Sequence, residues 1–227
     1  MKGSVLPSQP DQVALSQPGR PRGRPRELHA DAVVDAALNL GLSGVTLAAI
    51  AQRLGVGIAT VYRCVPGLDE LRDLVLSRLV GEAPWPHTAL PWMQYLDRLG
   101  LTVAAVLNSH RGVAEFCEPA AFANTDLLRI FGNSVTALVG QGFTTRDAIV
   151  AVDLVMHVTF DSMRNAHAAH STADARRHAF GHGLPREVSS AAIAVDEGMS
   201  RDDLVRLKLR ITIAGIESVR ADGQPLS

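Results

Sequence analysis

Apolar residues recur at helical spacing from residue 28 onwards. Two sets follow the i, i+3, i+4, i+7 spacing of one helix face: Val33, Ala36, Ala37 and Leu40, and then Leu47, Ile50, Ala51 and Leu54. The first predicted helix ends near Gly41. Thr46 is a favourable N-cap for the second, and Gly55 is a natural left-handed stop after it. The pattern therefore predicts two short helices close together in the chain.

A third short helix is predicted after Gly57, with Val61 and Val65 pointing inward. Pro66-Gly67 then interrupts the helical pattern. A fourth helix follows, and its apolar positions are Leu71, Leu74, Val75 and Leu79. The proline-containing stretch Gly81–Pro91 is typical of a linker or bend.

The rest of the chain also has helical periodicity. Further helices are predicted over Trp92–Ser109, Arg111–Cys117, Asp126–Val139, Thr145–His170 and Arg201–Arg220. Residues 171–200 are polar and uneven, which favours a mobile loop with some helix. Because no alternating strand pattern of useful length occurs, the predicted fold class is all-α.

Composition narrows the class of protein. The chain has 227 residues, 47% of them hydrophobic, and a formal net charge of −1, as in an ordinary globular protein. Neither a membrane-spanning apolar run nor a signal peptide is evident in the sequence, so we expect a cytoplasmic protein. Cys64 and Cys117 are far apart and fit free thiols in a reducing compartment.

Basic residues are concentrated near the N-terminus. Residues 1–26 are predicted to form a disordered arm, and its segment 17–26 holds Arg20, Arg22, Arg24 and Arg26 without an acidic residue. The run from Arg22 to Pro25 is similar to the core of an AT-hook, in which arginines enter the narrow minor groove of A·T-rich DNA. The alternative is a tail that is merely solvated.

The two short helices joined by residues 55–57 have the form of a helix-turn-helix. In that motif the N-terminal end of the second helix presents small and polar residues to base edges. The candidates for DNA contact are Thr46, Gly57, Ile58, Ala59, Thr60, Tyr62 and Arg63, together with Arg22, Arg24 and Arg26 of the arm. The alternative is a plain helical hairpin whose exposed residues have no such role.

Segments Ala30–Leu38 and Val45–Leu71 resemble the DNA-binding domain of the TetR family over about 50 residues. The matching positions are Thr46, Ile50, Ala51, Leu54, Gly55, Val56, Thr60, Val61, Tyr62 and Leu71. The resemblance implies an all-helical transcriptional regulator in which Thr46, Thr60, Tyr62 and Arg63 contact DNA.

The C-terminal part is similar, more loosely, to the tetracycline-repressor branch of that family. The similarity rests on residues 142–147, on His157 and Thr159, and on the apolar stripe from Leu207 to Val219. It implies a homodimer formed through the helices near 145–170 and 201–220 as a four-helix bundle. It also implies an apolar pocket for a small-molecule effector.

Three positions depart from the family pattern. Leu68 stands where a lysine often contacts a phosphate, and Gly57 stands where a polar residue often opens the recognition helix. Cys117 matches the histidine that ligates the magnesium of bound tetracycline. Since Mg²⁺ prefers oxygen and tolerates imidazole better than thiolate, we do not expect tetracycline as the ligand.

Apolar and aromatic residues of the C-terminal helices are the candidates for the effector pocket. They are Trp92, Phe116, Phe131, Met156, His157 and Phe160, although such residues at helical spacing also fit a plain core. His157, among apolar neighbours, also fits an interior histidine. His167, His170, His178 and His182 cluster in sequence; solvated histidines in a loop are the expectation, rather than a metal site.

The sequence holds no signature of an enzyme, a metal site or a cofactor site. We expect an arm (1–26), a helix-turn-helix DNA-binding domain (27–75), and an effector-binding and dimerisation domain (76–227). The predicted function is a dimeric, ligand-responsive repressor that binds a palindromic operator in double-stranded DNA. The alternatives are a ligand-binding helical protein with a degenerate DNA-binding part, and an A·T-preferring architectural DNA binder.

The arginine arm offers a first test, because it could offset the missing lysine at Leu68. Removal of residues 1–26 should weaken operator binding sharply, as measured by fluorescence anisotropy on labelled DNA. Unchanged affinity for the same DNA would show that the arm takes no part in binding.

Overall fold

The structure is a computed structural model that describes residues 28–121, 123–183 and 199–221. In these ranges every regular element is a helix. The helices are α1 (Ala30–Leu40), α2 (Leu47–Leu54), α3 (Ile58–Cys64), α4 (Leu68–Glu82), α5 (Trp92–Asn108), α6 (Val113–Ala121), α7 (Thr125–Val139), α8 (Thr145–Gly183) and α10 (Arg201–Ala221). The predicted all-α fold class is confirmed. None of the helices described is both long enough and apolar enough to cross a membrane.

Local signals in the sequence account for the first three helices. The Thr46 hydroxyl accepts a hydrogen bond from the Ala49 amide at 3.1 Å and so caps α2. Gly55 ends α2 in the left-handed conformation, with φ 67°. Leu40 differs from the prediction: it lies in the last turn of α1 and is exposed, whereas Val34 is buried. The buried face of α1 is therefore formed by Val33, Val34, Ala36 and Ala37.

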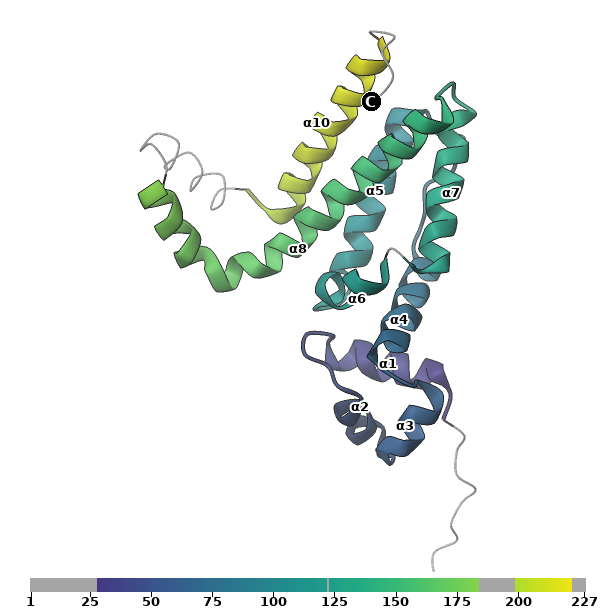
Figure 1. Cartoon of the computed structure of the whole chain (residues 1–227), viewed down its shortest axis with the longest axis vertical. Coiled ribbons are helices and arrows are strands. Elements are labelled where there is room, and N and C mark those ends of the chain that lie inside the picture. Colours follow the sequence, from purple (N-terminus) through teal and green to yellow (C-terminus); the bar gives the residue numbers. More distant parts are fainter. Residues whose placement is uncertain (1–27, 122, 184–198, 222–227) are drawn as a thin grey trace, which may run out of the picture.

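Helices α1–α3 pack together at one end of the molecule, and α4 leads from them to the other helices (Figure 1). We call α1–α3 the helix-turn-helix unit. Leu71 and Val75 of α4 are fully buried, and α4 packs against α1 as well as α6 and α7. The predicted domain boundary after residue 75 therefore falls inside one continuous helix, and the division into domains stays a prediction.

Helix α8 is the centre of the larger helical layer, where α5, α7 and α10 pack against it (Figure 1). At Gly100, α5 approaches α10 so closely that a Cβ would lie 2.6 Å from a methyl carbon of Leu209. The Tyr95 hydroxyl of α5 shares a buried 2.8 Å hydrogen bond with Ser134 of α7, and burial raises the pKa of this tyrosine. These contacts hold the layer together without any strand.

Two predicted helices differ from the structure by more than one residue at an end. The helix expected over Arg111–Cys117 is α6, Val113–Ala121, which starts later because Gly112 has a positive φ of 85°. The helix expected to end at His170 continues to Gly183. Its polar continuation suggested a loop, but residues 166–179 hold six alanines, which have the highest helix propensity.

The helix-turn-helix unit also touches the larger layer through backbone atoms. The Leu42 amide, after α1, donates to the Arg111 carbonyl oxygen, before α6, at 2.9 Å. A Cβ at Gly112 would lie 2.5 Å from the Ser43 backbone nitrogen, so only glycine fits without a shift of the backbone. The unit is thus attached both through α4 and through this backbone contact.

The Gly112→Ala substitution should lower the free energy of unfolding by about 2 kcal/mol or more, because it adds a clash with backbone to a strained positive φ. Chemical denaturation measures the loss. Gly132→Ala is the matched control: Gly132 lies inside α7 with open space around it, so alanine should be neutral or stabilise by about 0.5–1 kcal/mol. Equal stabilities for the two variants would contradict the close approach.

Candidate nucleic-acid interface and ligand cavity

Helix α3 presents one face to solvent and the opposite one to the core. Val61 and the following Val65 are fully buried and anchor it. Ile58 and Tyr62, one turn apart, are 45% and 47% exposed, and Ala59 and Arg63 are exposed beside them. The structure therefore brings the predicted DNA-contacting residues of this helix to one accessible surface.

Polar groups on this surface are oriented by local hydrogen bonds. The Thr60 hydroxyl accepts a 3.1 Å hydrogen bond from the Arg63 guanidinium, one turn further along α3. The exposed Thr46 hydroxyl caps α2 and still has its own proton to donate. At Gly57, the N-cap of α3, a Cβ would meet no atom within 4 Å, so the start of the helix is open. Such groups suit contacts to phosphate and base edges.

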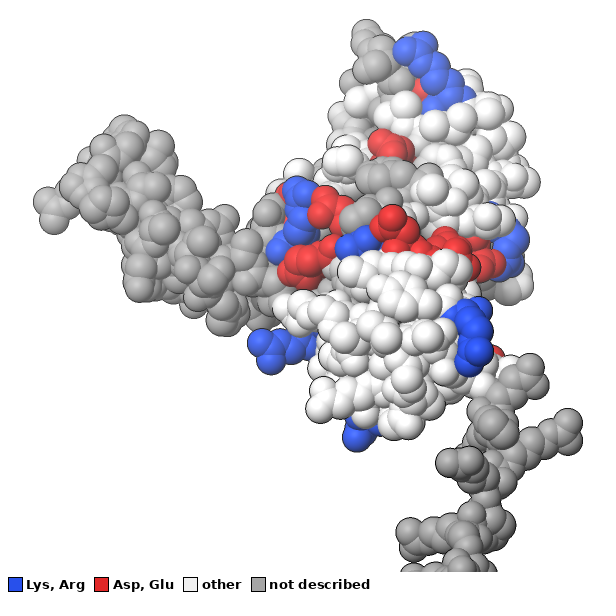
Figure 2. Space-filling view, turned by 60° about the horizontal axis from the view of Figure 1, so that its bottom comes forward, with Lys and Arg blue, Asp and Glu red and all other residues white. Residues whose placement is uncertain are grey.

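The segment that holds α2 and α3 carries positive charge and no negative charge. Residues 36–68, which include α2 and α3, contain Arg53 and Arg63 and no acidic residue. In Figure 2 this end is largely uncharged with basic residues at its margins, and the acidic residues form a band further up the molecule. A polyanion can thus approach α3 without meeting carboxylates. Arg22, Arg24 and Arg26 of the arm lie outside the described residues.

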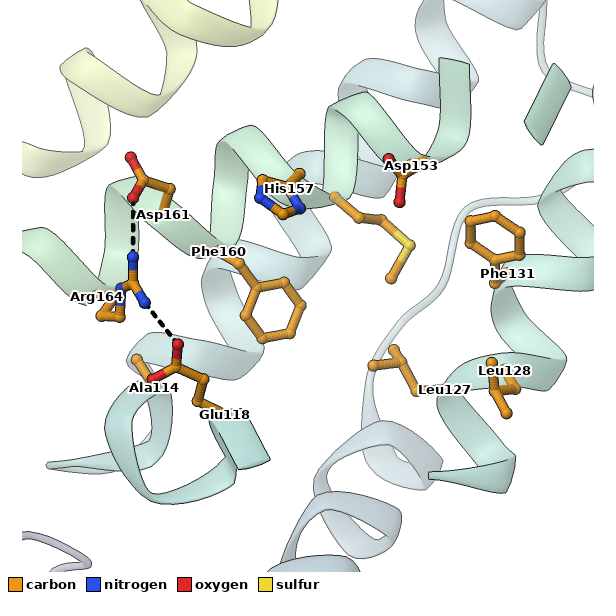
Figure 3. A pocket seen from close by; sticks show the side chains of 11 residues that line it. Ala114, Glu118, Leu127, Leu128, Phe131, Asp153, His157, Phe160, Asp161 and Arg164 are labelled. Carbon is orange, nitrogen blue, oxygen red and sulfur yellow. Dashed lines mark hydrogen bonds and ion pairs between the residues drawn. The ribbon is translucent and has the colours of Figure 1, made fainter. Parts of the chain in front are cut away.

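A cavity of about 400 Å³ lies between α6, α7 and α8. Four of the six predicted pocket residues line it: Phe131, Met156, His157 and Phe160. The other lining residues are Ala114, Glu118, Leu127, Leu128, Asp153, Asp161 and Arg164. Figure 3 shows Phe160 and Leu127 around its middle, Arg164, Asp161 and Glu118 towards one end, and Asp153 and Phe131 towards the other. The volume and the largely apolar lining are typical of small-molecule sites.

The two remaining predicted pocket residues lie elsewhere. Trp92 packs edge to face on Phe143, with ring centroids 5.3 Å apart, and the Arg220 guanidinium lies 5.2 Å from the Trp92 ring. Phe116 is buried on α6 and faces α4, where the Arg72 guanidinium lies 5.3 Å from its ring centroid. Helical spacing alone could not show which way these rings point.

His157 is exposed on α8 and borders the cavity, so it is not an interior histidine. The charged lining residues were not predicted. Asp153, His157 and Asp161 follow one another at intervals of four on α8, and this spacing, which places them on one face, was a usable signal. Arg164 forms ion pairs with Glu118 at 2.5 Å and with Asp161 at 3.3 Å. The hydrogen bond to Glu118, above all, raises the pKa of Arg164.

The thiol of Cys117 is fully buried on α6, and burial raises its pKa to about 12. At neutral pH it is therefore protonated, which makes it a poor metal ligand. Cys64 is half-buried and donates to the Leu28 carbonyl oxygen at 2.9 Å, and neither cysteine forms a disulfide. The side chains of His167, His170, His178 and His182 lie outside the described residues.

The fold is shared with solved structures of TetR family proteins. ActR from Streptomyces coelicolor superimposes with a TM-score of 0.68 at 21% identity, over 87% of this chain and 99% of that one. TetR from Acinetobacter baumannii superimposes with a TM-score of 0.66 at 20% identity, over 85% and 98%. These likenesses show that the chain has the fold of TetR family transcriptional regulators.

In sequence, the chain is 26% identical over 140 residues to the HTH-type transcriptional repressor DrrR1 of Streptomyces coeruleorubidus. The match covers 59% of this chain and spans about half (52%) of the length of that relative. No family model matches the chain. The fold that the resemblance to the TetR family implied is confirmed, and the relative in sequence is itself a helix-turn-helix transcriptional repressor.

Proposed function

We propose that the protein is a dimeric, ligand-responsive transcriptional repressor that binds a palindromic operator through α2 and α3. The observation that carries this proposal is the exposed face of α3, on which Tyr62 and Arg63 are accessible to DNA while Val61 anchors the helix. The lack of acidic residues from 36 to 68 supports it. Residues 27–75 would form the DNA-binding domain and residues 76–227 the regulatory one.

Exposed apolar side chains on α8 and α10 support a homodimer. Val150 and Leu154 lie one turn apart on α8 with 38% and 42% exposure, and Leu207 and Ile211 lie one turn apart on α10 with 39% and 64%. Leu154 and Ile211 border the same groove between the two helices. Pairing of this surface with its copy around a two-fold axis would bury it as a four-helix bundle.

The cavity between α6, α7 and α8 is the proposed effector site. ActR has been solved in complex with actinorhodin, and a TetR variant from Acinetobacter baumannii in complex with minocycline. Coupling to DNA requires only that the effector binds one spacing of the two α3 helices better than the other. Cytoplasmic localisation stays a prediction.

DNA binding is tested by fluorescence anisotropy on labelled DNA from upstream of the protein's own gene, with excess unrelated DNA and at two salt concentrations. The Arg63→Ala and Tyr62→Ala variants should each bind about tenfold or more weakly, because a contact to a base or phosphate is lost. Arg98→Ala is the control, since Arg98 is an exposed arginine on α5, outside the helix-turn-helix unit.

The same assay separates the proposal from its two alternatives. Saturable binding that survives competitor DNA supports a site-specific regulator. Binding that competitor abolishes favours the architectural binder that works through the arm. Absence of binding at either salt concentration favours a ligand-binding protein with a degenerate DNA-binding part.

The dimer surface has its own test, which is Ile211→Asp measured by light scattering after size exclusion. In a two-fold interface each protomer would bury one new carboxylate, and the cost of burying both charges should prevent dimerisation. The variant should therefore have the mass of a 24.2 kDa monomer, while the wild type has twice that mass. Leu40→Asp is the control, because Leu40 is a comparably exposed apolar side chain on α1. A dimeric Ile211→Asp variant would place the interface elsewhere.

A further inference from the structure

We infer that the cavity takes an effector with a flat apolar body and a positively charged nitrogen, and that the carboxylate of Asp153 is the counter-ion. The inference rests on the proposed function, in which this cavity is the effector site. It goes beyond the expectation of an apolar effector, because it assigns the effector a positive charge and names the side chain that binds this charge.

The apolar lining residues indicate the shape and polarity of the ligand that fits the cavity. Phe131 of α7 and Phe160 of α8 contribute two aromatic rings, and Leu127 and Met156 contribute flexible apolar surface between the helices. In Figure 3 Phe160 and Leu127 face the middle of the cavity, and Phe131 lies towards the end that Asp153 borders. Rings of this kind pack well on a flat, fused-ring compound, and about 400 Å³ lies within the size range of small-molecule sites.

The charged lining residues indicate the sign of the ligand's charge. Three carboxylates, Glu118, Asp153 and Asp161, and one guanidinium, Arg164, give the lining a formal charge of −2 with His157 neutral. The charged side chains are partly exposed, so solvent screens part of this field, but its sign at the cavity is negative. An anionic ligand would be repelled here, and a cation would be attracted.

The single cation of the lining is already engaged. Arg164 donates to Glu118 at 2.5 Å and to Asp161 at 3.3 Å, so its charge is shared between two carboxylates. Arg164 keeps further N–H donors, but an anion placed beside it would also lie next to the carboxylates of Glu118 and Asp161, which offset its charge. This end of the cavity therefore offers hydrogen-bonding groups but no uncompensated positive charge.

Asp153 is the carboxylate left for a ligand. It is exposed on α8 and forms no hydrogen bond or ion pair with any residue in the described part of the chain. Figure 3 places it near Phe131, at the end of the cavity away from Arg164. A protonated amine or quaternary ammonium at that end would meet both a carboxylate and an aromatic ring, the two groups that attract such cations.

The test compares two fluorescent probes that share three fused rings: 9-aminoacridine, a cation at neutral pH, and anthracene-9-carboxylate, an anion. Each is titrated with the full-length protein, without DNA. The cation should bind at least about tenfold more tightly than the anion, because one charge-assisted contact is worth that factor.

Variants of Asp153 identify the counter-ion. Asp153→Asn should weaken binding of the cation about tenfold, and Asp153→Lys should invert the preference towards the anion. Asp153→Glu keeps the charge and should keep the preference. Asp97→Asn is the matched control, since it removes the same charge from a half-buried position on α5 that does not line the cavity.

Three results would overturn the inference: equal affinity for the two probes, absence of binding of the cation, or unchanged binding by Asp153→Asn. Because Asp153 also borders the groove between α8 and α10, the mass of each variant is measured by light scattering, and Asp153→Glu separates loss of charge from a changed oligomer. Since no DNA is present, failure here leaves operator binding standing. A protein that binds the cation but no DNA would instead refute the proposed function alone.

Discussion

The arrangement of the molecule depends on α4, one continuous helix that packs against α1 of the helix-turn-helix unit and also against α6 and α7. On one side α4 packs against α1, where the Arg78 guanidinium pairs with Asp31 at 2.6 Å, and Leu71 and Val75 of α4 are fully buried. On the other side the fully buried Asn124 caps α7, and its amide nitrogen donates to the Asp73 carboxylate at 2.7 Å and to Ser77 at 2.9 Å. A shift of α7 against α4 must break these buried hydrogen bonds or carry the unit with it.

The backbone contact at Gly112 attaches the start of α6 to the helix-turn-helix unit as well. Because α6 starts at Val113, directly after the segment that touches Leu42 and Ser43, a rotation of α6 changes the loop before α2. The same helix carries Ala114 and Glu118 of the cavity. The proposed effector site and the proposed DNA-binding surface are therefore joined by short, well-packed connections, through which a preference of the effector for one spacing of the two α3 helices can act.

Helix α8 contributes to both proposed binding sites of the larger layer, the effector cavity and the dimer surface. Asp153, His157 and Asp161 border the cavity on one side and the groove towards α10 on the other. A ligand held by this row of side chains would lie next to the proposed dimer surface. Its binding energy could bias the packing of two protomers, and through it the spacing of the two α3 helices.

Signals between residues close together in the chain account for the local structure of the helix-turn-helix unit. Thr46, Gly55 and Val61 act through neighbours within a few residues, so capping and periodicity are sufficient to place α2 and α3. The cavity, in contrast, depends on contacts between residues far apart in the chain. Arg164 meets Glu118 across 46 positions, Phe116 turns towards α4, Trp92 packs on Phe143, and Gly112 is required by a backbone far away in sequence. Helical spacing defines a buried face but not the helix that will cover it, because that depends on how all the helices pack together.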